Sequence, residues 1–459
     1  MFFQASPGRL VRSFQQFVIS RKIATSGIIG ILITVGCCYG LDVIGATESK
    51  DASPTASNRV SDGPSENLPA SPDQSGDLLN YEQCVQTLSK GTSEDKRQAI
   101  RSLIRYRESA VEPILGALQD EDAAVRAEAI KALGELAPLK AEVVVPRLLK
   151  CIEEDDGYVD EQPNWIRSLQ AIGKYREKAL PIIEQQWEGG DSRKRAILCL
   201  VCYEIGPCAA PMVPKLIALA EEGPDIYRRT AIGALMAIGP DAAPAVPSLR
   251  KHLYHEDFHT QYWACRALAA IGPAALPAVP DLVDRLKNGV ASVRRNAAAA
   301  LGKLGPEIGP DAIAALIQAV DDPLQPVREQ AVLALGRLGP DAAAQARQAI
   351  ENSHEKRPIF PRSAATWAIW RLGGPIEPLV ESLVTEIKEG IYREEATEIL
   401  RAMGDAGRPV QTRLKESLAT VAETNPEEAA NIRETLREID QEPQKIDKSS
   451  NKGDDGHPE

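Results

Sequence analysis

Cysteine and histidine residues have the spacings in this chain that could support metal or redox chemistry. Cys199 and Cys202 form a Cys-x-x-Cys motif, which occurs in redox and metal sites. His252, His255 and His259 are close enough in sequence to share a metal ion. Both groups also have a structural interpretation, since buried cysteine behaves as a small hydrophobe and histidine is common in solvated loops. We favour the structural interpretation and expect neither a metal nor another cofactor.

Aromatic side chains gather around the same histidines. Aromatic residues make up only 5% of the chain, so a short stretch with two tyrosines, a phenylalanine and a tryptophan stands out. Exposed aromatic residues anchor protein interfaces, whereas partly buried ones fill gaps between helices, and the sequence leaves both interpretations open. The candidate partner-binding residues are Tyr254, His255, Phe258, His259, Tyr262 and Trp263.

These residues lie inside a repeated pattern. A Gly-Pro pair returns every 33 or 34 residues, and a fixed period in this range is typical of stacked supersecondary units. We call the first residue of each pair the anchor of its repeat. The pattern continues in weaker form toward both ends of the chain. The ten anchors are Arg107, Ala137, Gly173, Gly206, Gly239, Gly272, Gly305, Gly339, Gly373 and Gly404.

Each period predicts a helical hairpin. Apolar residues stand one, four and seven positions before the anchors and alanine mostly eight before, which is the apolar stripe of a helix. The glycine ends this first helix, and the proline after it cannot continue it. A second helix follows, with prolines such as Pro277 and Pro280 both expected in its first turn. Cys199 and Cys202 occupy the apolar positions, which favours core packing for both.

A basic residue stands eleven positions before most anchors. A ladder of this kind could hold an acidic ligand, or its members could bridge to carboxylates and helix ends of adjacent repeats. Asp122, Asp225 and Asp322 lie just upstream in the loops between repeats, so we favour the structural role. The inter-repeat basic ladder consists of Arg126, Arg195, Arg228, Arg294, Arg328, Arg362 and Arg393.

Three segments carry a resemblance to a known family. VRAEAIKALGELAP (125–138), VRRNAAAALGKLGPEI (293–308) and VREQAVLALGRLGPDA (327–342) resemble the short bacterial HEAT repeat, also called the phycobilisome-lyase HEAT-like repeat. The resemblance covers roughly residues 79–439. It implies an all-α fold of the armadillo type, an α-α superhelix or α-solenoid of about ten HEAT-type helical hairpins.

A sister family with similar repeats, the deoxyhypusine hydroxylases, binds iron through His-Glu pairs ten and nine positions before the anchor. Those positions hold other residues here, for example Arg295-Asn296. The two His-Glu pairs of this chain, His255-Glu256 and His354-Glu355, are out of that register, and we expect both in loops. The resemblance therefore does not extend to an iron site.

The first 46 residues form a separate segment. Arg21 and Lys22 precede an uncharged apolar stretch over residues 23–41, which predicts a cytoplasmic N-terminus and an exported remainder. The stretch fits a retained transmembrane anchor, a signal peptide cleaved near Ala46, or a lipoprotein signal at Cys37. All three alternatives place the solenoid outside the cytoplasm, either membrane-anchored or exported.

The remaining boundaries follow from composition. Residues 47–77 are polar and predict a disordered linker, and residues 440–459 predict a disordered tail. The solenoid spans residues 78–439. We expect a capping helix over residues 78–89 at one end, and at the other end a polar helix that is capped by Thr424 or Asn425.

The array of repeats indicates the function more clearly than any set of candidate catalytic residues. With a net charge of -12 and no basic run, we expect no nucleic-acid binding. We expect a monomeric, non-catalytic scaffold that is held at the membrane by its N-terminal segment. Its unidentified protein partner would bind a concave face lined by the second helices. The alternatives are a phycobilin-lyase-like enzyme, which the family name suggests, and a HEAT-repeat metalloenzyme, which the misplaced His-Glu pairs disfavour.

Overall fold

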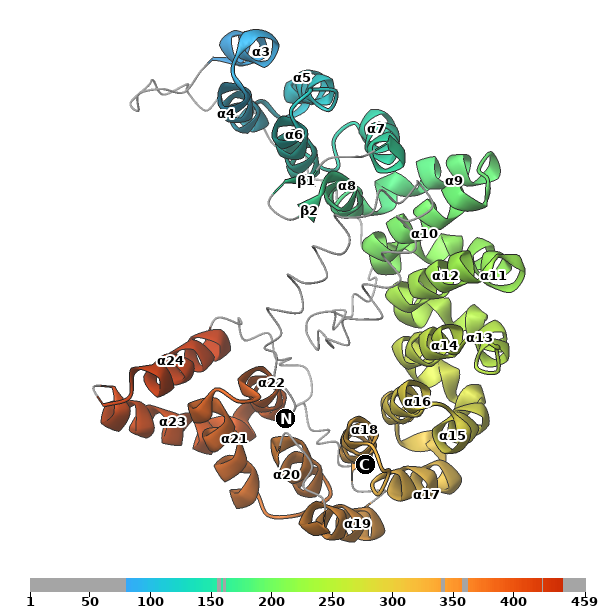
Figure 1. Cartoon of the computed structure of the whole chain (residues 1–459), viewed down its shortest axis with the longest axis vertical. Helices are drawn as coiled ribbons and strands as arrows, with labels where there is room; N and C mark the ends of the chain where they lie inside the picture. The colour runs from blue at the N-terminus through green and yellow to red at the C-terminus, as the bar shows by residue number, and fades with distance from the viewer. Residues whose placement is uncertain are drawn as a thin grey trace, which may run out of the picture. The chain divides into compact units, whose positions relative to one another are not determined.

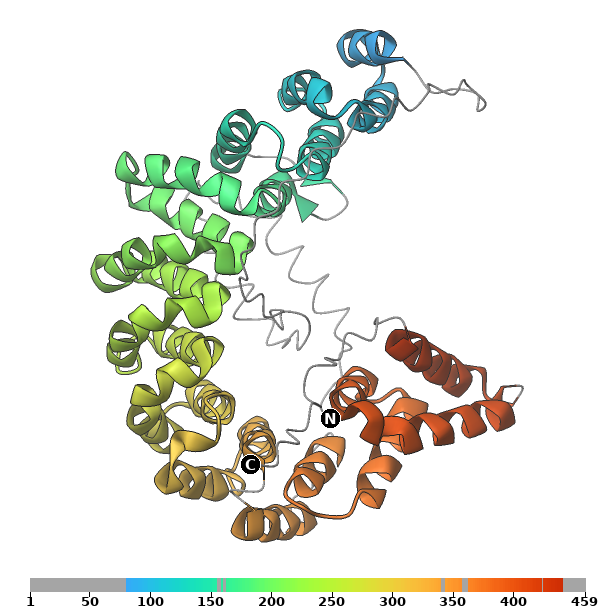
Figure 2. The ribbon, with the colours of Figure 1, turned by 180° about the vertical axis from the view of Figure 1, so that it is seen from behind.

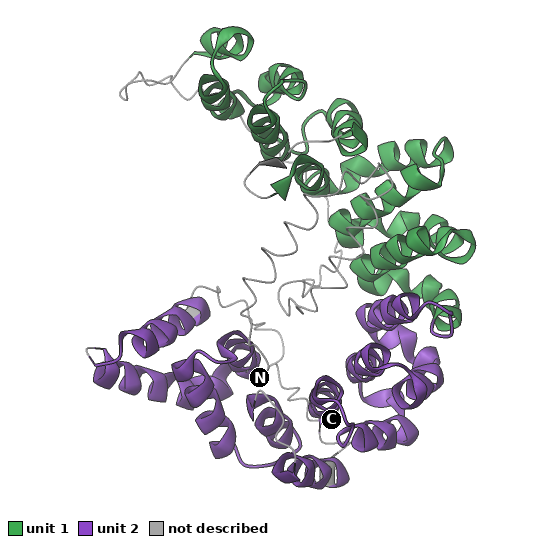
Figure 3. Cartoon of the chain, viewed as in Figure 1, with its two compact units in different colours: residues 1–252 green, residues 253–459 purple. Residues whose placement is uncertain are grey.

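The computed structural model describes residues 80–154, 158–159, 162–339, 343–356, 362–422 and 424–440. Two compact units divide the chain between His252 and Leu253 (Figure 3). Each unit contains five helical hairpins of the predicted kind, so the all-α solenoid of about ten hairpins is confirmed. The predicted N-terminal segment 1–46, the linker 47–77 and the tail beyond residue 440 lie outside the described residues.

The first helix of each hairpin ends at its anchor or one or two residues before it, except in the first hairpin, where it ends four residues before Arg107, and the apolar stripe that precedes the anchor is buried. In the fifth and sixth repeats, for example, Leu235 and Leu268 lie four positions before the anchor and are fully buried. Alanines eight positions before the anchor, such as Ala231 and Ala264, are fully buried too. The first helices are α4 (Ser93–Leu103), α6 (Ala123–Glu135), α8 (Asn164–Gly173), α10 (Ser192–Ile205) and α12 (Asp225–Ile238) in the first unit, and α14 (Phe258–Ile271), α16 (Ala291–Lys303), α18 (Gln325–Leu338), α20 (Arg362–Arg371) and α22 (Arg393–Met403) in the second.

The second helices form a row beside the first helices (Figure 1). They bury a stripe of their own, represented in one hairpin by Leu282 and Leu286. The second helices are α5 (Val111–Ala117), α7 (Ala141–Glu154), α9 (Leu180–Glu188), α11 (Val213–Glu222) and α13 (Val246–His252) in the first unit, and α15 (Val279–Asn288), α17 (Pro310–Ala319), α19 (Ala343–Lys356), α21 (Glu377–Glu389) and α23 (Arg408–Val421) in the second.

The turn inside each hairpin differs in detail from the prediction. Gly272 has φ 73° and ψ -141°, which lies outside the left-handed helical region, in backbone space that is open almost only to glycine. A 3-10 helix, η5 (Gly272–Ala278), follows before α15 begins. Pro277 therefore lies in this 3-10 turn and only Pro280 in the first turn of α15, so the prediction that both prolines open the second helix was wrong. The 3-10 turn uses residues that the helical pattern had assigned to α15.

Close approach between first helices is achieved with very small residues. A Cβ atom added to Gly302 of α16 would lie 2.6 Å from the Cα of Ala334 in α18, and one added to Gly336 would lie 2.9 Å from the Cα of Ala368 in α20. Figures 1 and 2 show α16 and α18 on the inner side of the bend within the second unit, with α15 and α17 on the outer side. In this unit the expectation that second helices line the concave face was wrong, because the small residues draw the first helices together.

Both ends of the array carry the expected extra helices. Helix α3 (Tyr81–Lys90) begins after Asn80, whose side chain and that of Gln83 form a capping box. At the other end α24 (Pro426–Asp440) begins after Asn425, whose Oδ1 accepts from the Glu428 N–H at 3.3 Å. Asn425, rather than Thr424, is therefore the cap.

Two further features complete the description. Strands β1 (Tyr158–Val159) and β2 (Gln162–Pro163) form a short antiparallel pair before α8, which the sequence analysis did not predict. Three hairpins are long and apolar enough, by length and composition alone, to cross a membrane. Each is folded back at a positive-φ glycine and contributes its apolar stripe to the stack, so we assign them to the solenoid. These hairpins span Ser192–Glu222, Asp225–His252 and Phe258–Asn288.

Candidate partner-binding surface

The aromatic residues predicted to bind a partner lie on and before α14, where the helix start fixes their positions. The Asp257 side chain caps α14 by accepting from the backbone N–H groups of His259 and Thr260, at 3.2 and 3.0 Å. Phe258 thereby becomes the first helical residue and remains 46% exposed. Its ring packs against that of His259, with centroids 4.0 Å apart.

Tyr254 belongs to a second group, which faces α15. Its hydroxyl donates to Asp281 Oδ1 at 3.3 Å, and the guanidinium of Arg285 lies 4.5 Å from its ring centroid. Desolvation, followed by the charges of Asp281 and Asp284, raises the pKa of Tyr254. Half of the residue is nevertheless exposed, so it offers an aromatic face with a fixed orientation.

Tyr262, Trp263 and Arg266 form a third group one turn further along α14. The two rings meet edge to face with centroids 5.6 Å apart. The Arg266 guanidinium lies 5.5 and 5.4 Å from the two ring centroids and donates to the Tyr262 hydroxyl at 2.6 Å. The arginine holds both rings in place, and the sequence analysis did not include it. It could have been found from its position, one helical turn after Tyr262.

His255 has a structural role in the loop before α14. Its Nδ1 accepts from the Asp257 backbone N–H at 3.1 Å, and its carbonyl accepts from Gln261 Nε2 at 2.7 Å. The six candidate residues thus form three small groups and a loop contact. Phe258 and Tyr254 are the exposed members, while Tyr262 and Trp263 are half-buried.

The basic ladder reaches the ends of the second helices. Arg195 Nε donates to the Trp187 carbonyl at 3.3 Å, and Arg228 Nε to the Ala220 carbonyl at 2.9 Å. Last-turn carbonyls have no partner inside their helix, so each arginine supplies a missing donor to the helix before it. Arg294 donates to the carbonyl of Gly289, which caps α15, whereas Arg126 and Arg328 donate to loop carbonyls beyond the second helix, those of Asp120 and Glu121 and those of Asp322 and Pro323.

Three ladder members also form ion pairs, of which Arg228 pairs with Asp225 of its own helix. Arg294 binds both carboxylate oxygens of Asp322 in the next repeat, at 2.8 and 3.0 Å, and the pair raises the pKa of Arg294. Arg393 pairs with Glu434 and Glu438 of the capping helix α24 at 3.3 and 2.9 Å. Arg362, the remaining member, begins α20 and is exposed.

The candidate metal and redox residues lie in ordinary packing positions. Cys199 and Cys202 are fully buried in α10, and burial raises the pKa of the Cys202 thiol to about 12. Both ring nitrogens of His252 lie within 2.9 Å of backbone carbonyl oxygens, those of Ser248 and Ala220. Among the described residues no group of three or more His, Cys, Asp or Glu side chains could hold a metal ion.

One expectation about the histidines needs correction. His354 and Glu355 were expected in a loop, but α19 continues to Lys356 and contains both. His354 is half-buried, and desolvation followed by the charge of Arg362 lowers its pKa. The polar sequence after residue 351 had suggested a loop, whereas a last helical turn tolerates such residues.

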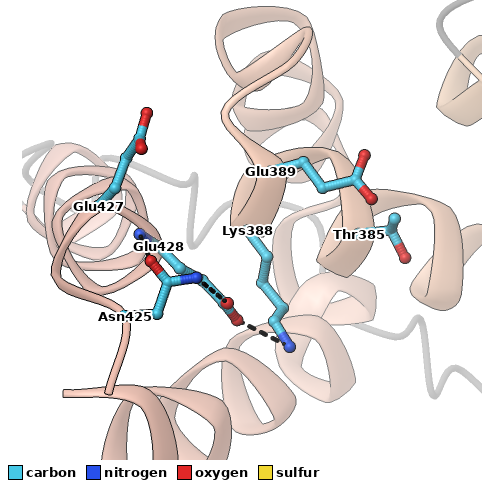
Figure 4. A pocket seen from close by; sticks show the side chains of 6 residues that line it. All are labelled: Thr385, Lys388, Glu389, Asn425, Glu427 and Glu428. Atoms are coloured by element: carbon cyan, nitrogen blue, oxygen red, sulfur yellow. Dashed lines mark hydrogen bonds and ion pairs between the residues drawn. The ribbon is translucent and has the colours of Figure 1, made fainter. Parts of the chain in front are cut away.

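A shallow pocket of about 360 Å³ lies where α21 meets α24 (Figure 4). Its lining is polar and internally paired: Lys388 Nζ lies 2.8 Å from Glu428 Oε1, and Asn425 Nδ2 donates to Glu428 Oε2 at 3.1 Å. These contacts fasten the capping helix to the last hairpins. We therefore interpret this pocket as structural.

Comparison with known proteins supports the interpretation of the repeats. The family described as HEAT repeats matches residues 82–162, 213–302 and 279–357. No curated protein matches the chain.

The solved structures that resemble this chain include a karyopherin, importin beta and an engineered protein. The karyopherin Kap121p bound to the SUMO protease Ulp1p is 13% identical, with 78% of this chain and 48% of that chain covered and a TM-score of 0.54. Importin beta is 16% identical, with 79% and 55% covered and a TM-score of 0.48. An engineered protein is 20% identical, with 79% and 99% covered and a TM-score of 0.38. The chain spans about half the length of the karyopherins it matches, and the likeness to Kap121p concerns the fold alone.

Proposed function

Because the chain belongs to the HEAT-repeat family, we propose that it is a non-catalytic scaffold that binds another protein through the surface of its repeats. The observation that carries this proposal is the use of side chains in each hairpin. The apolar stripe of every first helix packs inside the stack, which leaves its other side as one continuous surface over consecutive hairpins. Surfaces of this kind offer many separate contacts to a partner rather than one enclosed reaction site.

The aromatic groups of α14 are the best candidates for anchors within that surface. Aromatic residues held by neighbouring side chains lose little conformational freedom on binding, and Tyr254 is already fixed by Arg285 and Asp281. Phe258, the first residue of α14, adds an exposed ring. We therefore place the centre of the partner contact at Tyr254 and Phe258.

We further propose that residues 23–41 hold the scaffold at a membrane or direct its export. The support for this part is the sequence alone: a positively charged N-terminus, an uncharged apolar stretch and a polar linker. Protease treatment of intact cells tests it. An exported solenoid would be degraded from outside, whereas a solenoid degraded only after lysis would refute this placement.

Affinity purification of the full chain from detergent-solubilised membranes tests the binding function. We expect recovery of one or more protein partners. Recovery should fall about tenfold or more in a Tyr254→Ala, Phe258→Ala variant, because truncation of two anchor residues costs roughly 1–2 kcal/mol each. Tyr203→Ala is the matched control, since Tyr203 is 43% exposed but lies in the first unit, away from α14 in sequence.

Two results would count against the proposal. Repeated purification without any protein partner, together with a defined turnover activity, would show an enzyme. Bound tetrapyrrole, visible as absorption of the purified protein, would instead favour the lyase alternative. Equal loss of partner in the control variant would move the contact away from α14 while leaving the scaffold function intact.

A further inference from the structure

Charge is divided unequally between the two rows of helices over the first four hairpins of the second unit. The last hairpin differs, since its first helix α22 contains two basic and three acidic residues. The first helices α14, α16, α18 and α20 together contain eight arginines and lysines and one acidic residue. The second helices α15, α17, α19 and α21 contain five basic and nine acidic residues. The surplus of positive charge is unexpected in a chain whose net charge is -12.

The positive residues share a helical position. Three of the eight belong to the basic ladder, and the other five stand ten, six or two positions before their anchors, a spacing of four that places them along one side of the helix. The buried columns stand eight, four and one before the anchor, on the opposite side. We call the solvent-facing set the outer stripe. On the first four hairpins of the second unit it consists of Tyr262, Arg266 and Ala270 on α14, Arg295, Ala299 and Lys303 on α16, Glu329, Leu333 and Arg337 on α18, and Trp367 and Arg371 on α20, where Ser363 at the remaining position is buried. On α22 the same positions hold Glu394, Glu398 and Ala402.

The outer stripe differs from the basic ladder in what its side chains do. Ladder residues such as Arg294 and Arg328 are largely covered and donate to backbone carbonyls at the end of the second helix or in the loop after it. The stripe residues Lys303, Arg337 and Arg371 are exposed, so their charge reaches solvent. Of these, Arg371 also donates to the Gly336 carbonyl at 3.2 Å and lies 6.0 Å from the Trp367 ring centroid, which fixes its direction.

The first unit contains the same stripe independently. Six basic residues and two acidic residues occupy the positions ten, six and two before its anchors. Some of these residues form ion pairs, for example Arg101 with Glu128 of the next repeat at 2.8 Å, but the net charge of the stripe remains positive. The residues are Arg97, Arg101, Arg105, Lys131, Arg167 and Arg229, with Glu135 and Glu204.

We propose that the outer stripe of the second unit binds an acidic, extended polypeptide segment of the protein partner. This inference rests on the proposed scaffold function and specifies the chemistry of its partner. Packed helices lie about 8–10 Å apart, and a chain in the extended polyproline II conformation advances about 3.1 Å per residue with three residues per turn, so every third side chain returns to the same side after about 9 Å. A segment with an acidic side chain at every third residue therefore brings successive carboxylates to Lys303, Arg337 and Arg371.

The side chains between the cations suit such a segment. Ala299 and Leu333 leave a low apolar strip between charged positions, and Tyr262 and Trp367 offer aromatic contacts at its two ends. A polypeptide presents apolar side chains between its carboxylates and can use this strip. Nucleic acid carries negative charge at every step and would also meet the acidic surplus of the second helices, so the observations favour a polypeptide.

Fluorescence anisotropy with the full chain in detergent tests the inference. The probe is a labelled peptide in which every third residue is glutamate and the others are alanine and serine. Comparison probes are a peptide of equal charge with its glutamates in one block and a thymidine oligonucleotide of equal charge. We expect the spaced peptide to bind most tightly, and to bind more weakly as ionic strength rises.

Matched charge reversals locate the site. Lys303→Glu, Arg337→Glu, Arg371→Glu should weaken peptide binding about tenfold or more, because three exposed ion pairs become repulsive. Lys287→Glu, Arg347→Glu, Lys356→Glu makes the same change in net charge at exposed positions of the second helices and should weaken binding less than about twofold. If circular dichroism shows that the first variant has lost helix, the corresponding glutamine substitutions replace it, with a smaller loss expected.

Several results would overturn the inference. No binding of any acidic peptide, equal weakening by the two triple variants, or tighter binding of the oligonucleotide would each do so. Partner recovery from membranes separates this failure from that of the proposed function. A partner that is still recovered with the outer-stripe variant leaves the scaffold function standing and refutes the acidic-segment site alone.

Discussion

The anchor glycines allow a test of backbone strain that is almost free of side-chain effects. Gly272 has a positive φ of 73°, and a Cβ added there meets no atom within 4 Å. Gly272→Ala therefore changes only the backbone energy. A non-glycine residue in such a conformation costs roughly 1–3 kcal/mol, and the lower entropy of unfolded alanine offsets about 0.5–1 kcal/mol of that. We expect a net destabilisation of about 1–2 kcal/mol.

Gly233→Ala is the matched control because it adds the same methyl group with the opposite expected sign. Gly233 lies inside α12, and a Cβ there also meets no atom within 4 Å. Alanine is the better helix former, so this variant should be more stable by about 0.5–1 kcal/mol. The pair separates the conformation of the backbone from the presence of the methyl group.

The assay combines urea unfolding with hydrogen exchange of the hairpin 258–288, because repeat proteins open locally as well as globally. Gly272→Ala should lower the urea midpoint and speed exchange in that hairpin, and Gly233→Ala should raise the midpoint. If both variants shift the midpoint in the same direction, the assignment of strain to the anchor is refuted.

Three further predictions follow from the packing. Gly302→Ala should destabilise the second unit by roughly 1–3 kcal/mol, because the added Cβ would lie 2.6 Å from the Cα of Ala334. Thermal unfolding of the variant and the wild type measures this loss of stability. Arg294→Met removes a partly buried ion pair and a helix-end donor and should cost roughly 2 kcal/mol, whereas Arg295→Met beside it should stay within about 0.5 kcal/mol in urea unfolding. Desolvation raises the pKa of buried Glu386, so its ionisation in the folded state is unfavourable. Glu386→Gln should therefore be more stable than wild type at neutral pH, and the difference should vanish as the pH falls below the ordinary pKa of a glutamate. Unfolding at several pH values measures this difference.

The fold could be predicted because each position is repeated. A single window of this sequence does not separate a helix from a loop with certainty, but ten aligned windows show the same columns. Leu268 and Ala264 illustrate the result, since both fall in columns expected to be apolar and both are fully buried. The period also fixes where each first helix ends, because the residue at the anchor must accept an unusual backbone conformation.

Curvature and turn geometry could not be predicted from the same columns. Short connections lie on both sides of each first helix, so the pattern does not show which row packs more closely. That depends on contacts between residues of different repeats, such as Gly302 and Ala334. A periodic pattern does not fix details that depend on one or two residues. Two such details are the 3-10 turn that contains Pro277 and the helical conformation of His354.

The candidate site shows a different limit. The sequence grouped six residues by proximity along the chain. A helix makes one turn in 3.6 residues, so it directs neighbouring side chains to different sides. Tyr254 accordingly contacts Arg285 and Asp281, while Tyr262 contacts Arg266. Proximity in sequence grouped the six residues into one region and could not divide that region into faces.

The outer stripe was visible in the same alignment, and the columns that build the stack do not set the sign of its charge. The columns one, four and eight before the anchor must be apolar for the stack to form, and the column eleven before it supplies donors to helix ends. In α14, α16 and α18 the columns ten, six and two are at least partly exposed, so the stack accepts either sign of charge there. A chain with 65 acidic and 53 basic residues should place more acids than bases at such positions, yet α14, α16, α18 and α20 place five basic residues and one acidic residue there, whereas α22 has the expected sign with Glu394 and Glu398. Because Arg337 is exposed and exposed ion pairs contribute little to stability, a single reversal such as Arg337→Glu should change the free energy of unfolding by less than about 1 kcal/mol, and its main cost should appear when the partner binds.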